Sequence, residues 1–256
     1  MFENTNLPWL EKHLILYAWA GSTSYNTRVE DSDDDFRGIC IPPEQFYFGL
    51  QGFDQYRSPE NSGEDIEIKS IKEYVRLALD GNPNVIEWLF TKPEFFVYIN
   101  EIGQELINIR HQFLSKQFFK KVSGFAKGQK HEMENDGKNN RGQGSLKRIA
   151  DRQKYGYDVR SASHLIRIDY EGIEVMETGN LNTWRSDKER KLLVDIKTGK
   201  LTKSQVLEIH DELDAKLYQA YLKTELPETP DYHKNNKFLI ELTKEYRRKY
   251  KDDRYY

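Results

Sequence analysis

Two aspartates, Asp33 and Asp35, follow a Gly-Ser pair at Gly21 and Ser22 after a spacer of ten residues. We expect the aspartates to open a strand, where residues i and i+2 face the same side and can hold one ion between them. Two carboxylates this close repel each other unless a divalent cation neutralises them, and hard oxygen ligands suit Mg²⁺ or Mn²⁺. The pair therefore predicts a magnesium or manganese site.

The Gly-Ser pair supplies the second half of this chemistry. Gly21 allows a ligand to approach the backbone closely, and the Ser22 hydroxyl with neighbouring amides can hold phosphate oxygens. A third carboxylate is expected from the strand 64–70, where Asp65 and Glu67 share one face and either or both could serve. Carboxylates beside a phosphate-binding turn predict a two-metal site for in-line phosphoryl or nucleotidyl transfer.

Two other interpretations of the acidic run 31–35 compete with this one. Taken alone, such a cluster is more often a solvated turn than a set of ligands. A calcium-binding EF-hand loop starting at Asp31 would need Gly at its sixth position and Glu at its twelfth, where this chain has Phe36 and Pro42. The calcium loop is therefore excluded. The Gly-Ser turn directly after an apolar strand favours a nucleotidyltransferase site over a solvated turn.

A row of cations is predicted on a helix that begins after Asp158, where Arg160, His164 and Arg167 fall at positions i, i+4 and i+7. Apolar side chains lie roughly opposite, so the helix is expected to bury one side and present the cations from the other. Guanidinium groups bind phosphate oxygens through paired hydrogen bonds, which suits a triphosphate. Asp158 is a natural N-cap for this helix, and Tyr157 stands just outside it.

These cations also have a plainer interpretation. The row could be a solvated face paired with Glu171 or Glu174, and His164 could be a structural histidine. Lys127 and Lys130 project from another predicted helix and are candidate phosphate ligands, although lysines at such positions usually serve solubility. Both interpretations of each residue stay open on the sequence alone.

The elements that must position these residues change character along the chain. Strands are predicted at 13–21, 35–42 and 64–70, and the glycine- and proline-containing stretch 43–63 is expected to be a loop or lid. A helical apolar period then begins at Ile71. Helices are predicted over 71–80, 83–90, 98–114, 116–133, 145–154, 158–169, 187–196, 203–223 and 234–250. Residues 131–144 are expected to form a mobile loop, and 171–181 a non-helical connector or small hairpin.

The strand-rich start and helical remainder predict an α+β fold. We expect a catalytic domain over 1–112, with a small mixed sheet and helices, and a helical nucleotide- and acceptor-binding domain over 113–256. The 256 residues suffice for a sizeable core, and a single cysteine argues against a disulfide scaffold or a Cys-rich zinc site and suits a reducing, cytoplasmic setting. No apolar run is long enough to span a membrane. A net charge of −3 argues against a nucleic-acid coating protein but permits a local basic patch.

The Gly-Ser, spacer and Asp-x-Asp pattern resembles the signature of the DNA polymerase beta nucleotidyltransferase superfamily. The longer strings GSTSYNTRVEDSDDDFRG, DIEIKSIKEYVRLALDGNPNVIEWLF and YGYDVRSASHLIRIDYEGIEVMETGNL, in this order, resemble the RNA repair pathway DNA polymerase beta family of predicted nucleotidyltransferases. The resemblance implies a polymerase-beta-like head with Asp33 and Asp35 as metal ligands and Asp65 as the third carboxylate. Two departures concern that third ligand: Asp34 stands between the paired aspartates, and Glu67 occupies a position expected to be apolar.

We therefore expect a Mg²⁺- or Mn²⁺-dependent nucleotidyltransferase that moves a nucleoside monophosphate from an NTP, such as ATP, to an acceptor hydroxyl and releases pyrophosphate. The acceptor implied by the resemblance is an RNA or other nucleic-acid end. Nucleotidylation of a protein or small molecule is an alternative, and so is a non-catalytic nucleotide- or RNA-binding regulator. The expected catalytic residues are Asp33, Asp35, Asp65 and Glu67, of which the first three would bind metal. The expected nucleotide-binding residues are Gly21, Ser22, Arg37, Lys127, Lys130, Tyr157, Arg160, His164 and Arg167.

Overall fold

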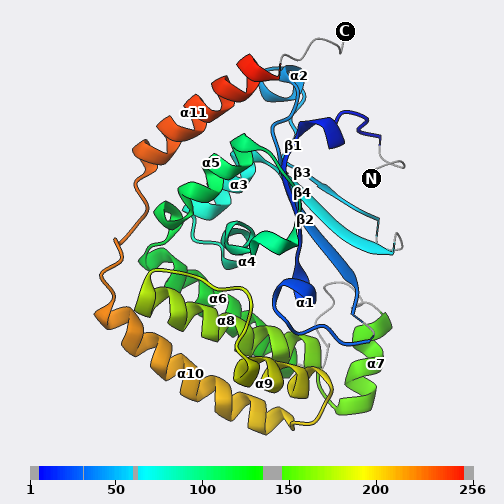
Figure 1. Ribbon diagram of the computed structural model, residues 1–256. Helices are drawn as coiled ribbons and strands as arrows, with labels where there is room; N and C mark the ends of the chain where they lie inside the picture. Colours follow the sequence, from blue (N-terminus) through cyan, green and yellow to red (C-terminus); the bar gives the residue numbers. More distant parts are fainter. Residues whose placement is uncertain (1–5, 31, 60–62, 135–145, 251–256) are drawn as a thin grey trace.

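A computed structural model describes residues 6–30, 32–59, 63–134 and 146–250 (Figure 1). Within these residues one five-stranded sheet has the order β3-β4-β2-β1-β5. β2 and β4 are parallel, and the other neighbours are antiparallel. The mixed sheet confirms the α+β prediction. The strands are β1 (Leu14–Trp19), β2 (Asp34–Cys40), β3 (Gln55–Arg57), β4 (Glu64–Ser70) and β5 (Phe96–Ile99).

Helices surround this sheet unevenly. α3, α4 and α5 lie along one face of the sheet, while α6, α8 and α10 pack side by side below it and α9 packs on α8 (Figure 1). The α-helices are α1 (Gly21–Ser24), α2 (Glu44–Tyr47), α3 (Ile71–Leu79), α4 (Pro83–Ile86), α5 (Glu101–Asn108), α6 (Lys116–Glu134), α7 (Leu146–Tyr155), α8 (Val159–Thr178), α9 (Asp187–Lys197), α10 (Lys203–Lys223) and α11 (Tyr232–Lys249). The 3₁₀ helices are η1 (Glu11–His13), η2 (Glu87–Phe90), η3 (Pro93–Phe95) and η4 (Arg110–Phe113).

The strand register explains why chemistry-bearing residues meet at one place. In the parallel β2–β4 pair, Asp35 lies beside Asp65 and Arg37 lies beside Glu67. Side chains two residues apart on a strand share a face, so both pairs project from the same side of the sheet. β2 is the middle strand of the sheet, and β1, which is almost entirely buried, lies between β2 and the edge strand β5.

Helix α8 is longer than the sequence pattern indicated. The prediction of a non-helical connector at 171–181 is wrong, because α8 continues to Thr178 and ends where Gly179 adopts a left-handed conformation with φ +65°. The glycine inside this segment, Gly172, does not break the helix. A Cβ on Gly172 would lie 3.0 Å from side-chain atoms of both Leu217 and Val122, so the missing side chain lets α8 approach α6 and α10 closely.

Four other element predictions need correction. The segment 43–63 is not wholly a loop, since α2 and the edge strand β3 lie within it, and residues 60–62 are outside the described part. The helix predicted over 98–114 is instead the end of β5, then α5 and η4. Residues 131–134 of the predicted mobile loop continue α6, and the rest of that loop is not among the described residues. The predicted helix 83–90 is α4 followed by η2.

The hydrophobic core joins both parts of the chain. One cluster of buried residues includes Ile39 and Ile86 from the sheet half and Val122, Met176 and Leu217 from the later helices. A second cluster is confined to helices from α6 onward and the loops between them. α11 then returns to the sheet half and packs on α3. The domain boundary predicted after residue 112 stays a prediction. Residues from both sides of this boundary belong to the first cluster.

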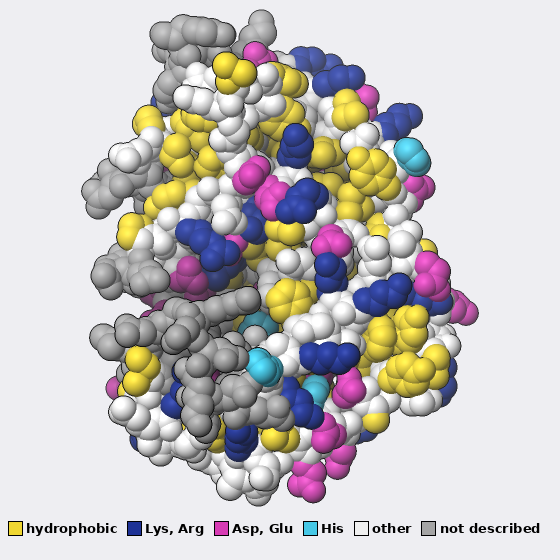
Figure 2. Space-filling model, turned by 180° about the vertical axis from the view of Figure 1, so that it is seen from behind, with side chains coloured by type: hydrophobic (Ala, Val, Ile, Leu, Met, Phe, Trp, Pro, Cys, Tyr) yellow, Lys and Arg dark blue, Asp and Glu magenta, His cyan; other side chains and the backbone are white. Residues whose placement is uncertain are grey.

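No helix in the described part of the chain is both long and apolar enough to cross a membrane. Figure 2 shows the face seen from behind Figure 1, where Lys and Arg side chains are interspersed with Asp and Glu rather than gathered in one large basic field. This agrees with the balanced composition of 39 basic and 42 acidic residues.

The N-terminus of α8 offers a test of the local fold. As predicted, Asp158 is the N-cap: it accepts hydrogen bonds from the backbone N–H groups of Arg160 and Ser161, at 3.1 and 3.0 Å. Asp158→Ala should lower the free energy of unfolding by about 1–2 kcal/mol, measured by urea titration. Asp158→Asn keeps a capping oxygen and should lose less. Equal losses for the two variants would show that the cap does not stabilise the helix.

Candidate active site

A cleft of about 700 Å³ lies where the sheet meets α1, α3, α4, α6, α8 and α9. The structure brings together most of the residues predicted from the sequence, from segments more than a hundred residues apart. Those that line the cleft are Gly21, Ser22, Asp33, Asp35, Arg37, Asp65, Glu67, Arg160, His164 and Arg167.

The turn after β1 is packed directly against the paired carboxylates. Gly21 has φ +54°, which favours glycine, and a Cβ at this position would overlap the Asp35 carboxylate. The backbone N–H of Ala20 donates to the carbonyl of Asp35 at 2.9 Å, which ties the start of the turn to β2. Ser22 Oγ is buried and has no hydrogen-bond partner among the described residues. This hydroxyl is therefore available to an oxygen of a ligand in the cleft.

The pKa of the Asp35 carboxyl group is raised. Burial, and then the charges of Asp65 and Asp33, raise its pKa from the usual 3.8 to about 6, although Arg37 opposes the shift. Holding three carboxylates near one another without a counter-ion is unfavourable. The site is therefore built to receive positive charge.

Asp65 and Glu67, the two carboxylates of β4 in the cleft, differ in how strongly they are paired with cations. Asp65 Oδ2 lies 3.0 Å from Arg37 Nη2 and is more than half exposed, at 57%. Glu67 accepts ion pairs from Lys69 at 2.6 Å and Arg57 at 3.1 Å, and Arg37 Nε lies 3.8 Å away. Although burial works in the opposite direction, Lys69 and these two arginines hold the pKa of Glu67 below its usual value. Glu67 is thus much more strongly neutralised by protein cations than Asp65.

These carboxylates fit a divalent metal ion in part. Their oxygen donors are those that Mg²⁺ and Mn²⁺ prefer, and the raised pKa of Asp35 reflects a deficit of positive charge. In the described part of the chain, however, no three or more His, Cys, Asp or Glu side chains lie close enough together to hold a metal ion. Asp33 and Asp35 could hold one between them, while the Arg37 guanidinium stands against Asp65.

Arg167 lines the cleft but is only 6% exposed, because carboxylates and an aromatic ring surround its guanidinium. Its guanidinium pairs with Glu87 Oε2 at 2.8 Å and Glu171 Oε1 at 2.6 Å, and lies 3.9 Å from the centre of the Tyr25 ring. The Tyr25 hydroxyl in turn donates to Glu87 Oε1 at 2.6 Å. Tyr25 follows α1, Glu87 belongs to η2, and Arg167 and Glu171 belong to α8. This buried network therefore connects the turn at Gly21–Tyr25 to the helical part.

Two cations reach the Asp33 and Asp35 end of the cleft. Arg160 Nη1 lies 4.0 Å from Asp33 Oδ2, and its Nε donates to Asp151 at 3.1 Å. Lys197, at the end of α9, donates to Ser32 Oγ at 3.1 Å. Burial, and then the charge of Arg160, lower the pKa of Lys197, while Asp35 and Asp33 oppose this shift. Nothing in the sequence distinguishes Lys197, because a lysine in the last turn of a helix is common for reasons of helix stability alone.

Three candidate nucleotide-binding residues are not brought into the cleft. Lys127 is exposed on α6, and Lys130 pairs with Asp211 of α10 at 3.0 Å. Tyr157 is buried in the second hydrophobic cluster, and its hydroxyl donates to the carbonyl of Leu201 at 2.8 Å. Lys130 and Tyr157 are bound by other parts of the helical region, and none of the three side chains lines the cleft, so their direct contact with a ligand there is not supported.

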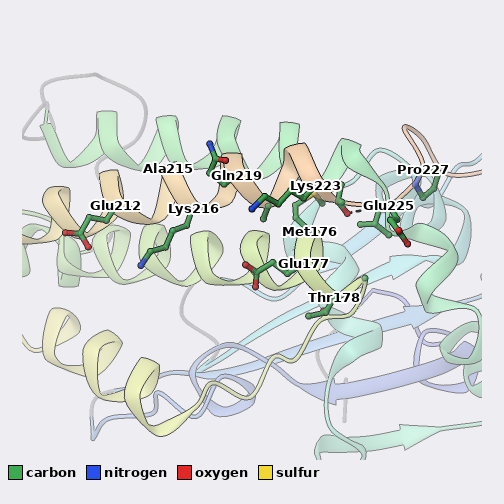
Figure 3. Close-up of a pocket in the computed structure, with 14 residues that line it drawn as sticks. Met176, Glu177, Thr178, Glu212, Ala215, Lys216, Gln219, Lys223, Glu225 and Pro227 are labelled. Carbon is green, nitrogen blue, oxygen red and sulfur yellow. Dashed lines mark hydrogen bonds between the residues drawn. The ribbon is translucent and has the colours of Figure 1, made fainter.

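A larger cavity, of about 1040 Å³, lies between the C-terminal parts of α8 and α10. Figure 3 shows Glu177 on α8 and Lys216, Lys223 and Glu212 along α10. None of the residues predicted from the sequence lines it. Acidic and basic side chains alternate there without a paired carboxylate or a phosphate-binding turn, so size alone does not identify the functional site.

The sheet and the helices packed on it bring paired carboxylates, a glycine turn and cations to one cleft. Over residues 4–241 the chain matches the RNA repair pathway DNA polymerase beta family, and it belongs to that family. It is also 30% identical over 91 residues to an uncharacterized 38.9 kDa protein of the nrdC-mobD intergenic region of Enterobacteria phage T4, a match covering 32% of this chain and only 27% of the phage protein.

A solved nucleotidyltransferase-like protein from Exiguobacterium sibiricum aligns with 91% of this chain and 74% of its own, at 11% identity and a TM-score of 0.28. Similarity this low bears on neither substrate nor mechanism. The family match covers the described residues of the cleft. It is consistent with a transferase acting on nucleotides, and the sequence resemblance to this family is confirmed.

The two arginines of α8 should differ sharply in their effect on stability. Arg167→Ala leaves Glu87 and Glu171 buried without their cation and should lower the free energy of unfolding by about 3–5 kcal/mol. Arg160→Ala removes a partly exposed cation and should change it by about 1 kcal/mol or less. Urea titration of both variants measures the difference. Similar small losses for both would mean that the buried network does not fasten α8 to the sheet half.

Asp35 should destabilise the metal-free protein at neutral pH. Its pKa is about 6 in the folded state against the usual 3.8, so the folded protein holds the proton more tightly and loses stability as the pH rises through this interval. Metal-free Asp35→Asn should therefore exceed the wild type in free energy of unfolding by roughly 1–3 kcal/mol at pH 7, with the gain disappearing near pH 4. A constant difference between pH 4 and pH 7 would contradict the origin assigned to the shift.

Proposed function

We propose that this protein is a Mg²⁺- or Mn²⁺-dependent nucleotidyltransferase that joins the α-phosphorus of an NTP to an acceptor hydroxyl and releases pyrophosphate. One observation carries the proposal: the Gly21 turn is packed against Asp35 in a cleft that also holds Asp33, Arg160 and Lys197. Phosphate-binding amides, paired carboxylates and cations at one place are what in-line nucleotidyl transfer requires.

The triphosphate end of the substrate would bind at the mouth of the cleft. Ser22 Oγ and the backbone N–H groups of the turn would donate to phosphate oxygens. Arg160 and Lys197 would add positive charge from α8 and α9 and orient the pyrophosphate as it leaves. The lowered pKa of Lys197 also suits a proton donor to this leaving group.

Asp33 and Asp35 would hold the divalent cation. When bound, this ion would neutralise phosphate charge and lower the pKa of the attacking hydroxyl. Of the two carboxylates on β4, Asp65 suits the third catalytic position better, because it is exposed and only Arg37 must move away from it. Glu67 would remain paired with Lys69 and Arg57 as a support for β4.

Arg167 fits a positioning role better than direct phosphate binding. Two carboxylates already neutralise its charge, and the Tyr25 ring covers it. Through Tyr25 and Glu87 it would hold the turn in register with α8, where Arg160 stands. His164 lines the cleft between these two arginines and remains a candidate ligand for the nucleotide.

An RNA or other nucleic-acid 3′ hydroxyl is the acceptor we propose. It is supported by the family to which the chain belongs. The acceptor would enter from the side of Asp65, the exposed carboxylate. Nucleotidylation of a protein or small hydroxyl compound is the second candidate. Incubation with α-labelled NTP and each acceptor class separates these: label should enter RNA, and label entering only protein would contradict the proposed acceptor.

The paired aspartates should be essential, and the chain provides a matched control between them. Asp33→Ala and Asp35→Ala should each reduce transfer from α-labelled NTP by roughly a thousandfold, because the charge at the reacting phosphates is no longer balanced. Asp34 pairs with Arg28 at 2.6 Å and does not line the cleft. Asp34→Ala should retain activity within a few-fold. Full activity in the Asp33 and Asp35 variants would rule out the catalytic role.

Lys197 should contribute to nucleotide binding. Lys197→Ala should weaken NTP binding by roughly tenfold, as expected for the loss of one charge-assisted hydrogen bond, and Lys197→Arg should restore most of it. Lys188→Ala removes an exposed lysine from the same helix and serves as the control. Isothermal titration of NTP provides the measurement. Equal affinities for Lys197→Ala and Lys188→Ala would remove Lys197 from the site.

A further inference from the structure

The cleft is lined by uncharged residues as well as by the charged residues described above. They include the amide side chains of Asn84 and Gln129 and the apolar side chains of Leu77, Val85 and Phe125. These residues come from α3, α4 and α6, so they lie on elements that the catalytic carboxylates do not use. We call this part of the cleft the amide end and define it by these five residues.

The side-chain amides of Asn84 and Gln129 make no hydrogen bonds to other described residues. Asn84 is held through its backbone, whose N–H donates to Asn82 Oδ1 at 3.1 Å, and within the described residues its side-chain amide makes no hydrogen bond. The same is true of the Gln129 side chain on α6. Both side chains are only partly exposed. Partly buried amides that stabilise nothing within the protein are suited to a ligand.

A third polar group close to this region also lacks a partner. Trp88 follows α4, lines the same cleft and is only 3% exposed, and its indole Nε1 has no hydrogen-bond acceptor among the described residues. A buried indole N–H without an acceptor is unfavourable, and most buried Trp side chains find one. Lys69 Nζ, which lies 5.8 Å from the centre of the Trp88 ring, is already bound by Glu67 at 2.6 Å and Gln55 at 2.7 Å. Arg167, which lines the same cleft, is paired with Glu87 and Glu171.

This combination selects for a flat, neutral ligand with hydrogen-bonding edges. An amide offers one acceptor and two donors, which match the edges of nucleobases, and a Phe ring or aliphatic side chain packs against a base face. Phosphates or carboxylates would find no cation here that is not already paired. The whole cleft, at about 700 Å³, has the size of a pocket for one ligand rather than two.

We propose that the amide end binds the nucleobase of the NTP and that Asn84 and Gln129 determine which base is accepted. The inference rests on the proposed nucleotidyltransferase function and deepens it, because it assigns the base preference to named side chains. The nucleotide would lie along the cleft, with its triphosphate at Ser22, Arg160 and Lys197 and its base against Phe125.

The test separates base binding from phosphate binding by using inorganic tripolyphosphate, which has no base. Affinities for ATP, GTP, CTP, UTP and tripolyphosphate are measured by isothermal titration for the wild type, Asn84→Ala, Gln129→Ala, Arg160→Ala and the control Gln219→Ala. Gln219 is an exposed amide on α10 in the other cavity. Asn84→Ala and Gln129→Ala should lose roughly tenfold or more affinity for the preferred NTP, and the preference among bases should shrink by a similar factor.

Tripolyphosphate should bind these two variants about as well as the wild type, which also shows that they are folded. Arg160→Ala should lose affinity for NTP and tripolyphosphate alike, and Gln219→Ala for neither. Unchanged NTP affinities in both amide variants would overturn the inference. This holds even if transfer to an acceptor falls in these variants, because the amides would then serve the acceptor. A wild type that binds neither NTP nor tripolyphosphate would contradict the proposed function itself, and the inference with it.

Discussion

The parallel pairing of β2 and β4 imposes the constraint on which the rest of the structure depends. It sets Asp35 beside Asp65 and Arg37 beside Glu67 on one face, so like charges are held together at the edge of a packed core. Arg37, Lys69 and Arg57 relieve this on the β4 side, while Asp35 keeps a raised pKa. The sheet thus holds Asp35 and Asp65 close together in the cleft, where the proposed function would require positive charge.

The later helices place Arg160 and Lys197 near the carboxylates of Asp33 and Asp35, and the buried Arg167 network holds α8 in this position. By pairing with Glu87 and Glu171 and covering Tyr25, Arg167 joins three segments that are far apart in sequence. Such a network is weak evidence for stability when compared with an apolar core, but removal of one member is severe. Its value here is geometric: it fixes the distance between the Gly21 turn and the face of α8 that carries Arg160.

Much of the site could be predicted from sequence because its determinants are local. Gly21, Ser22, Asp33 and Asp35 lie within one turn and strand, and strand periodicity alone puts the aspartates on one face. The pattern of α8 indicated Arg160 and His164, which line the cleft, but could not reveal that Arg167 is paired with Glu87, a residue distant in sequence. Lys197, Asn84 and Gln129 were missed for the same reason: only the tertiary fold brings them to the cleft. The errors at 98–114 and 171–181 arose where packing, as at Gly172, overrides local propensity.

The most direct test of the account is a crystal structure of the protein with Mn²⁺ and a non-hydrolysable NTP, with the metal located by its anomalous scattering. The account predicts Mn²⁺ bound by Asp33 and Asp35, with the triphosphate against Gly21 and Ser22 and within reach of Arg160 and Lys197. It also predicts that Arg37 no longer contacts Asp65. Nucleotide bound elsewhere, for example in the larger cavity beside Glu177 and Lys216, with no metal at Asp33 and Asp35, would contradict it.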